Sequence, residues 1–169
     1  GAAIAIVSFL VTGHAATAPP VWLMVPVVGV HLICAAFWLG ALPPLVGAVR
    51  RLPALEAGAS FVQFSNHAVY AVAALVLSGV VISWTQVKNP EALTTTDYGL
   101  RLLSKVGMVA FVVGLAFINK TVLTPKLLRA EGGGAELMLR SIILEIVLHA
   151  LILAVAVSLT LTAPPRALG

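Results

Sequence analysis

The stretch that decides the fold is Val21–Val49, VWLMVPVVGVHLICAAFWLGALPPLVGAV, whose only ionisable side chains are those of His31 and Cys34. At about 1.5 Å per residue, a helix of this length exceeds the roughly 30 Å thickness of a bilayer's hydrocarbon core. Three more stretches of similar apolar character follow along the chain. The pattern predicts an integral membrane protein whose function resides in the few polar groups that it carries into the membrane.

The composition of the whole chain agrees with this prediction. Of its 169 residues, 60% are hydrophobic and only 9% are charged, and the mean hydropathy is +1.08, which excludes an ordinary soluble domain. The net charge of +4 comes from basic residues near segment ends, so it indicates membrane topology and not nucleic-acid binding. The single cysteine excludes an internal disulfide. Motifs of soluble enzymes are missing, which favours a transporter or metal-binding membrane protein over an enzyme.

Prolines and glycines divide the chain into five apolar segments, whose lengths suit helices and which lack the alternating polarity of a barrel strand. The segments are Ala2–Gly13, Val21–Val49, Phe61–Val87, Tyr98–Leu123 and Arg140–Thr162. The expected breakers are Pro19-Pro20, Pro53, Asn89-Pro90, Pro125, Gly132-Gly133-Gly134 and Pro164-Pro165. We therefore expect an all-α membrane bundle with four full transmembrane helices and a short N-terminal helix.

The first apolar segment is too short to cross a bilayer alone. We expect residues 1–169 to form one transmembrane domain, the C-terminal part of a longer multi-span protein. The distribution of lysine and arginine predicts its orientation, because cytoplasmic loops are enriched in these residues. Six of them lie near the ends of the second and fourth connections, namely Arg50, Arg51, Lys120, Lys126, Arg129 and Arg140. These connections are therefore expected in the cytoplasm, and His14, 89–97 and the C-terminus on the outer side.

His31 is the first candidate for chemistry, because a polar residue in mid-membrane must find partners inside the bundle and imidazole is a common copper ligand. Met24, Cys34 and Trp38 lie on the same helical stripe, which makes Met24 and Cys34 candidate sulfur ligands for Cu(I). Packing of both side chains is the alternative. His14, at the predicted outer rim, is a further candidate, as an entry ligand for the metal.

Glu145 and His149 are spaced four residues apart on the fifth segment and so face the same way. A buried carboxylate there is able to orient the histidine, to relay protons, or simply to hold the helix in the bundle. Ideal helix rise places His31 and His149 roughly 15 Å below the outer surface, so they are candidates to share one metal or haem iron. His67 is expected near the inner interface, where it is a candidate supporting residue.

Several short phrases, taken in order, resemble the copper-resistance D (CopD) family of bacterial inner-membrane proteins. They begin with Thr12-Gly13-His14 and continue with His31-Leu32, Trp38-Leu39-Gly40, Ser78-Gly79, Tyr98-Gly99, Asn119-Lys120, Glu145 and Pro164-Pro165. The resemblance implies a multi-pass protein of the inner membrane that takes part in copper uptake or copper resistance, together with a periplasmic copper-binding protein. His14 and His31 lie on family-like phrases, whereas His67 and His149 do not.

Three hypotheses remain open from the sequence. The first is copper binding or transport with His14, His31 and His149 as nitrogen ligands, Met24 and Cys34 as sulfur ligands, and Trp38, Glu145 and His67 in support. The second is a haem b electron-transfer protein or oxidoreductase with His31 and His149 as axial ligands. The third is a structural or assembly subunit. The sequence also allows a homo-oligomer.

Overall fold

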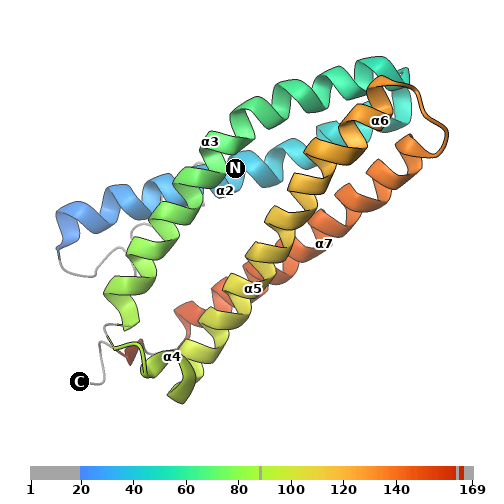
Figure 1. Ribbon diagram of the computed structural model, residues 1–169. Coiled ribbons are helices and arrows are strands. Elements are labelled where there is room, and N and C mark those ends of the chain that lie inside the picture. The colour runs from blue at the N-terminus through green and yellow to red at the C-terminus, as the bar shows by residue number, and fades with distance from the viewer. Residues whose placement is uncertain (1–19, 88, 163, 166–169) are drawn as a thin grey trace.

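The computed structural model describes residues 20–87, 89–162 and 164–165, and within these ranges the chain is helical. Four helices are long and apolar enough to cross a membrane: 21–51, 54–87, 97–128 and 134–160. They run alternately up and down along the bundle (Figure 1). The four predicted spans are thereby confirmed. The expected N-terminal helix and His14 lie outside the described residues.

Helices α2 (Val21–Arg51) and α3 (Ala54–Val87) form an antiparallel hairpin with extensive contact along its length. Pro53 ends α2, as expected, since Leu52 is extended at ψ 155° and α3 begins directly after the proline. Pro26, Pro43 and Pro44 lie inside α2 without ending it. Interior prolines are tolerated in membrane helices, because neighbouring helices and local adjustments satisfy the backbone carbonyls that they free.

The helix of the third span contains one wider, π-helical turn that the sequence did not predict. Helix α5 (Asp97–Ile118) passes into one π-helical turn, η1 (Asn119–Leu123), and then into α6 (Thr124–Leu128). Pro125 was expected to break the helix, and this expectation was wrong. Proline has no N–H to donate and its ring crowds the preceding turn, so the wider π-turn absorbs the misfit and the helix continues to Leu128.

Helix α7 (Gly134–Thr160) begins six residues earlier than expected, directly after the glycine triplet. Gly133 precedes it with φ 77°, a left-handed conformation that suits glycine, and so makes the tight turn possible. A short helix, α4 (Ala92–Thr95), connects α3 to α5 at the other end of the molecule. Helix α3 likewise starts seven residues before the predicted segment, because Glu56 is compatible with an exposed first turn.

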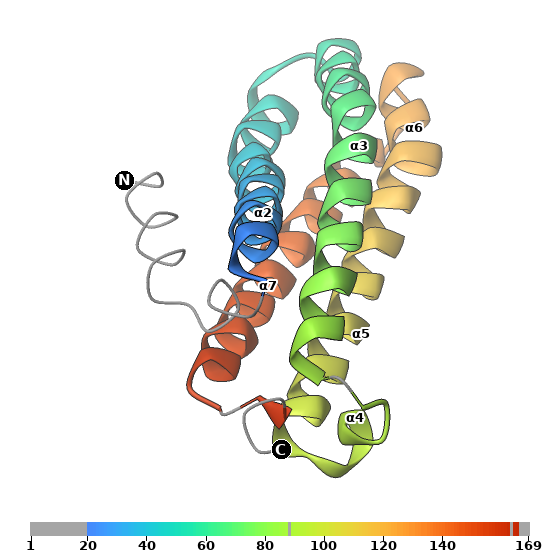
Figure 2. The same ribbon diagram turned by 90° about the vertical axis from the view of Figure 1, so that its left-hand side faces the viewer.

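The bundle is closed at one end and diverges at the other. The α2–α3 and α6–α7 loops lie together at the closed end, here called the α6 end, as Figures 1 and 2 show, and α3 packs on α6 there. At the opposite end, called the α4 end, the α2–α3 hairpin and the α5–α7 pair separate (Figure 1). The prediction that the two basic loops share one side of the membrane is confirmed. Which side faces the cytoplasm stays a prediction.

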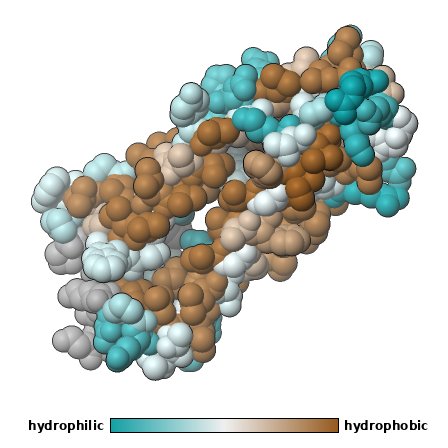
Figure 3. Space-filling view, in the orientation of Figure 1, coloured by the Kyte–Doolittle hydropathy of each residue, from teal (hydrophilic) through white to brown (hydrophobic). Residues whose placement is uncertain are grey.

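The surface agrees with a membrane setting. Apolar side chains cover the middle of the molecule, and hydrophilic residues gather at its two ends (Figure 3). Large apolar side chains such as Tyr70, Leu77 and Phe117 are between 65% and 78% exposed, as expected of a helix surface that lipid covers. The main apolar core surrounds Trp38, Leu42 and Ile142. A smaller apolar cluster surrounds Met24 near the α4 end.

Candidate functional site

His31 is held against α3 by one edge of its ring. Its Nδ1 atom lies 3.2 Å from the carbonyl oxygen of Leu75 and 3.1 Å from the hydroxyl oxygen of Ser78. The ring passes close over Gly79, where a Cβ atom would stand 3.3 Å from its Cε1. Ser78 and Gly79 thus make room for the imidazole, and Ser78 also supplies one of its hydrogen-bond partners.

These contacts determine where the proton of a neutral His31 resides. A carbonyl oxygen can only accept, and the Ser78 hydroxyl donates to the carbonyl of Ala74 at 2.7 Å, so both partners require an N–H on Nδ1. The lone pair is then on Nε2, which has no hydrogen-bond partner among the described residues. Such an arrangement, with a backbone carbonyl fixing Nδ1, is the usual way to orient a histidine that binds a metal through Nε2.

The positive charge of Lys105, which lies on α5, acts electrostatically on His31 of α2. Lys105 is half-buried, whereas Arg101, one turn closer to the α4 end, is exposed. A cation bound at His31 would therefore experience repulsion from the ammonium group, and an anion would be attracted. The sequence did not predict that Lys105 and His31 interact, because the two residues lie on different helices and far apart in the chain.

A second polar cluster lies closer to the α6 end and is centred on Glu145 of α7. Its Oε1 atom accepts a hydrogen bond of 2.5 Å from Nδ2 of Asn119, and the indole of Trp38 lies beside the same carboxylate. All three residues are at most 6% exposed. The Oδ1 atom of Asn119 is buried with no hydrogen-bond partner among the described residues. Asn119 starts the π-turn, so the local widening of the helix places this amide at the cluster.

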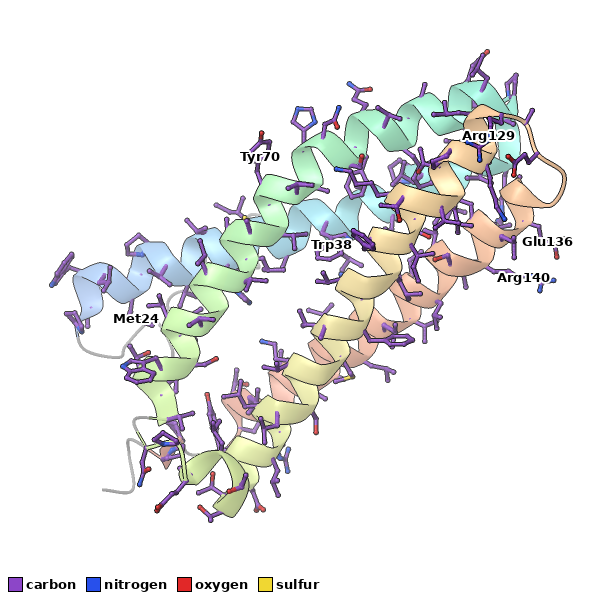
Figure 4. The ribbon with its side chains drawn as sticks, viewed as in Figure 1. Met24, Trp38, Tyr70, Arg129, Glu136 and Arg140 are labelled. Carbon is purple, nitrogen blue, oxygen red and sulfur yellow. The ribbon has the colours of Figure 1, made fainter. Side chains whose placement is uncertain are left out.

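His149 is attached to this cluster through Trp38. The two rings meet edge to face with centroids 5.3 Å apart, and the His149 Nδ1 donates to the carbonyl of Glu145 at 2.8 Å. Three roles for Glu145 were left open by the sequence. In the structure its carboxylate bonds to Asn119, and the hydrogen bond to His149 is made by the backbone carbonyl of Glu145. Figure 4 shows Trp38 inside the bundle, between α3 and the α5–α7 pair.

The structure gives His31 and His149 separate partners. His31 is attached to α3, whereas His149 contacts Trp38, which lies seven residues, or roughly 10 Å of helix rise, further along α2 than His31. Within the described residues, no group of three or more His, Cys, Asp or Glu side chains is arranged to hold a metal ion. The two histidines are thus parts of two different polar clusters, and a site shared between them stays a prediction.

The remaining predicted residues have simpler surroundings. Met24 is fully buried, and its sulfur accepts a weak hydrogen bond from Thr85 at 3.7 Å. Cys34 is half-buried with a free thiol. His67 is exposed in the half of α3 that leads from the α6 end, and its Nδ1 bonds to the Gln63 carbonyl of its own helix at 2.9 Å. None of these three brings a second ligand to His31 in the contacts of the described chain.

Between α3 and the α5–α6 span lies a cavity of about 200 Å³, with α2 and α7 behind it. Its lining is almost entirely apolar, and its polar side chains come from the Glu145 cluster and from Ser65, Lys120 and Thr124. The lining includes Trp38, Phe61, Phe64, Phe117, Asn119 and Glu145. Sequence reasoning named Glu145 and Trp38 but had no means of bringing Asn119 to them, since 26 residues separate Asn119 from Glu145 along the chain.

Comparisons with known proteins identify the family. The family model described as copper resistance protein D matches residues 58–159, which is more than half of the chain. The chain belongs to the CopD family. It is 32% identical over 139 residues to the inner membrane protein YebZ of Escherichia coli strain K12, a match that covers 80% of this chain. No solved structure matches significantly.

Membership of the CopD family connects this chain with copper resistance, and the predicted resemblance is confirmed. The four apolar spans and the relationship to YebZ make it a multi-pass protein of the bacterial inner membrane. The chain spans about half the length of that relative, since the match covers 47% of it. The matched region begins at Gly58, so it contains the residues of α3 that hold His31 and the whole Asn119–Glu145 pair, but not His31 itself.

Proposed function

We propose that this CopD-family chain forms part of a copper-uptake or copper-resistance protein of the inner membrane, and that His31 contacts copper as it passes through the bundle. The observation that carries the proposal is the state of the His31 ring: Nδ1 is bonded to Leu75 and Ser78, which leaves the Nε2 lone pair for a metal. Imidazole nitrogen suits copper in either common oxidation state. Family membership supplies the copper connection.

A single imidazole binds copper weakly. Weak binding suits a site that copper passes through better than a site that stores copper. The further ligands that we propose are His14, which lies outside the described residues, and Cys34, one helical turn from His31 on the same stripe. Met24 is a weaker candidate, because its sulfur is buried and bonded to Thr85. A periplasmic copper-binding protein is the proposed donor. The haem alternative has no support in the described residues, since His31 and His149 have separate partners.

Copper accumulation in cells that lack their own uptake route tests the proposal. We expect His31→Ala to reduce copper accumulation at least fivefold at equal protein abundance in the membrane. His67→Ala is the matched control, because His67 is exposed and bonded only to its own helix. Equal copper accumulation in the wild type and His31→Ala would overturn the role of His31.

The Lys105 charge gives a second and more specific test. If copper contacts His31, removal of the nearby ammonium in Lys105→Gln should raise the affinity of the purified protein for copper, because a cationic neighbour is lost. Arg101→Gln is the control, since Arg101 is exposed one turn away on the same helix. A change of similar size in both variants, or a weaker affinity in Lys105→Gln, would speak against copper at His31.

A further inference from the structure

The cavity beside Glu145 has features of a ligand site that copper handling does not use. It contains a buried acceptor without a partner, Asn119 Oδ1, next to a carboxylate that is itself an acceptor. Nδ2 of Asn119 already donates to that carboxylate. The cation of the lining, Lys120, is exposed. An unpaired buried acceptor is costly, and what it lacks is a hydrogen-bond donor. The site is therefore complementary to a molecule that brings O–H or N–H groups.

The walls of the cavity specify the rest of such a molecule. Trp38, Phe61, Phe64 and Phe117 surround it together with aliphatic side chains, which suits a flat apolar ring. Its volume of about 200 Å³ compares with the roughly 150 Å³ of an apolar cavity known to hold benzene. A six-membered ring with small substituents therefore fits, whereas a bulky polar headgroup does not.

The position of the opening indicates where the ligand comes from. Val69 and Phe117 line the cavity on the side between α3 and α5 and are 50% and 65% exposed, so in a membrane they face lipid. A ligand that enters there must itself be dissolved in the bilayer. Lys120 also lines the cavity and is exposed, so it brings a cation to the outer part of the lining. A carboxylate or phosphate headgroup, which brings only acceptors, would nevertheless leave the buried Asn119 Oδ1 without a donor.

We propose that this cavity binds the headgroup of a lipid-soluble quinol, with a ring hydroxyl donating to Asn119 Oδ1 and the ring packed among the aromatic side chains. The oxidised quinone binds less well, since it carries only acceptors. This proposal does not depend on copper reaching His31, which lies roughly 10 Å away along α2 from the level of Trp38.

Binding of tritium-labelled decylubiquinol to the purified chain in lipid nanodiscs, kept anaerobic, tests the proposal by scintillation proximity. We expect saturable binding that n-decane, which has no hydrogen-bond donor, does not displace and that oxidised decylubiquinone displaces roughly tenfold less effectively than the quinol. Failure to saturate, or equal displacement by decane, would mean that the cavity accepts any alkyl chain and would overturn a quinol site. Equal displacement by the quinone would overturn the assignment of donors to the ligand.

Variants connect the binding to the cavity. Asn119→Ala should weaken decylubiquinol binding roughly five- to tenfold, because a hydrogen bond to a buried acceptor is lost. The matched control is Ser141→Ala: the Ser141 hydroxyl is the other buried polar atom without a partner in the described chain, but it does not line the cavity. Unchanged affinity in Asn119→Ala, or an equal loss in Ser141→Ala, would show that water alone occupies the position.

A third variant guards against misfolding as the explanation. Ala116→Phe keeps Asn119 and Glu145 and fills the cavity from its α5 wall. We expect it to abolish decylubiquinol binding while the protein stays monodisperse with unchanged helical circular dichroism. Retained binding in Ala116→Phe would place the ligand elsewhere on the protein and so contradict the proposal.

Discussion

Asn119 and Glu145 connect the third and fourth spans in the middle of the bundle: Nδ2 of Asn119 donates to Oε1 of Glu145 at 2.5 Å, and the two residues are only 6% and 2% exposed. The π-turn that begins at Asn119 brings the amide to this position, and Thr124 Oγ1 satisfies the Asn119 carbonyl at 2.8 Å. A buried carboxylate that retains a donor is much less costly than one without. The pair therefore stabilises the packing of α5 against α7.

The energetic coupling of this pair is the first prediction. In a double-mutant cycle of Asn119→Ala and Glu145→Ala, we expect a coupling free energy of roughly 0.5–1.5 kcal/mol, the range of interhelical hydrogen bonds in membranes. Unfolding by SDS in mixed micelles measures it. A cycle between Asn66→Ala and Glu145→Ala is the control, because Asn66 is exposed on α3. Additive effects in the Asn119 cycle would contradict the interaction.

The proton position on His31 is the second prediction. Since Leu75 and Ser78 both accept from Nδ1, we expect a neutral ring with the proton on Nδ1 and the lone pair on Nε2. Nitrogen-15 NMR of histidine-labelled protein distinguishes the two tautomers, and His31→Ala assigns the signal. Ser78→Ala should retain the tautomer through Leu75 but broaden the signal. A proton found on Nε2 would remove the argument for metal contact through that atom.

The corner between α4 and α5 provides the third prediction. A Cβ atom on Gly99 would stand 2.2 Å from the carbonyl oxygen of Ala92, which is impossible without movement of the backbone. We expect Gly99→Ala to lower the free energy of unfolding by about 1–3 kcal/mol, as for other overpacked sites. Gly107→Ala on the same helix meets nothing within 4 Å and should leave stability nearly unchanged. Equal effects would indicate that the corner is looser than described.

Membrane orientation is the fourth prediction, and it tests the charge asymmetry of the loops. In a Cys34→Ala background, single cysteines at Glu56 and Gly132, both exposed near the α6 end, should resist a membrane-impermeant maleimide in intact spheroplasts. A cysteine at Thr94, exposed in α4, should react. Labelling of Glu56→Cys and Gly132→Cys on opposite sides would contradict the hairpin arrangement itself, and labelling of both from outside would reverse only the orientation.

The spans were predictable from sequence because a bilayer imposes one demand on every residue along a helix. Roughly 20 consecutive apolar residues are needed to cross, so length and composition are sufficient evidence. The starts of α3 and α7 were placed too late, since helices continue past the hydrocarbon core into polar first turns. Pro125 was misjudged for a different reason: whether proline ends a helix depends on whether the preceding turn can widen, and the surrounding helices decide that.

By itself, the sequence determined that the chain has apolar stretches long enough to cross a membrane, four of them within the described residues. It also determined that the two basic loops lie on the same side and that few polar residues interrupt the apolar stretches. Only the tertiary structure decided what those residues do with one another. His31 acquired Ser78 and Leu75 from α3, and the Glu145 carboxylate acquired Asn119, whereas His149 bonds to the backbone carbonyl of Glu145. The physical reason is that helical periodicity fixes which residues share a face, whereas the rotation and depth of each helix against its neighbours depend on packing between residues far apart in the chain.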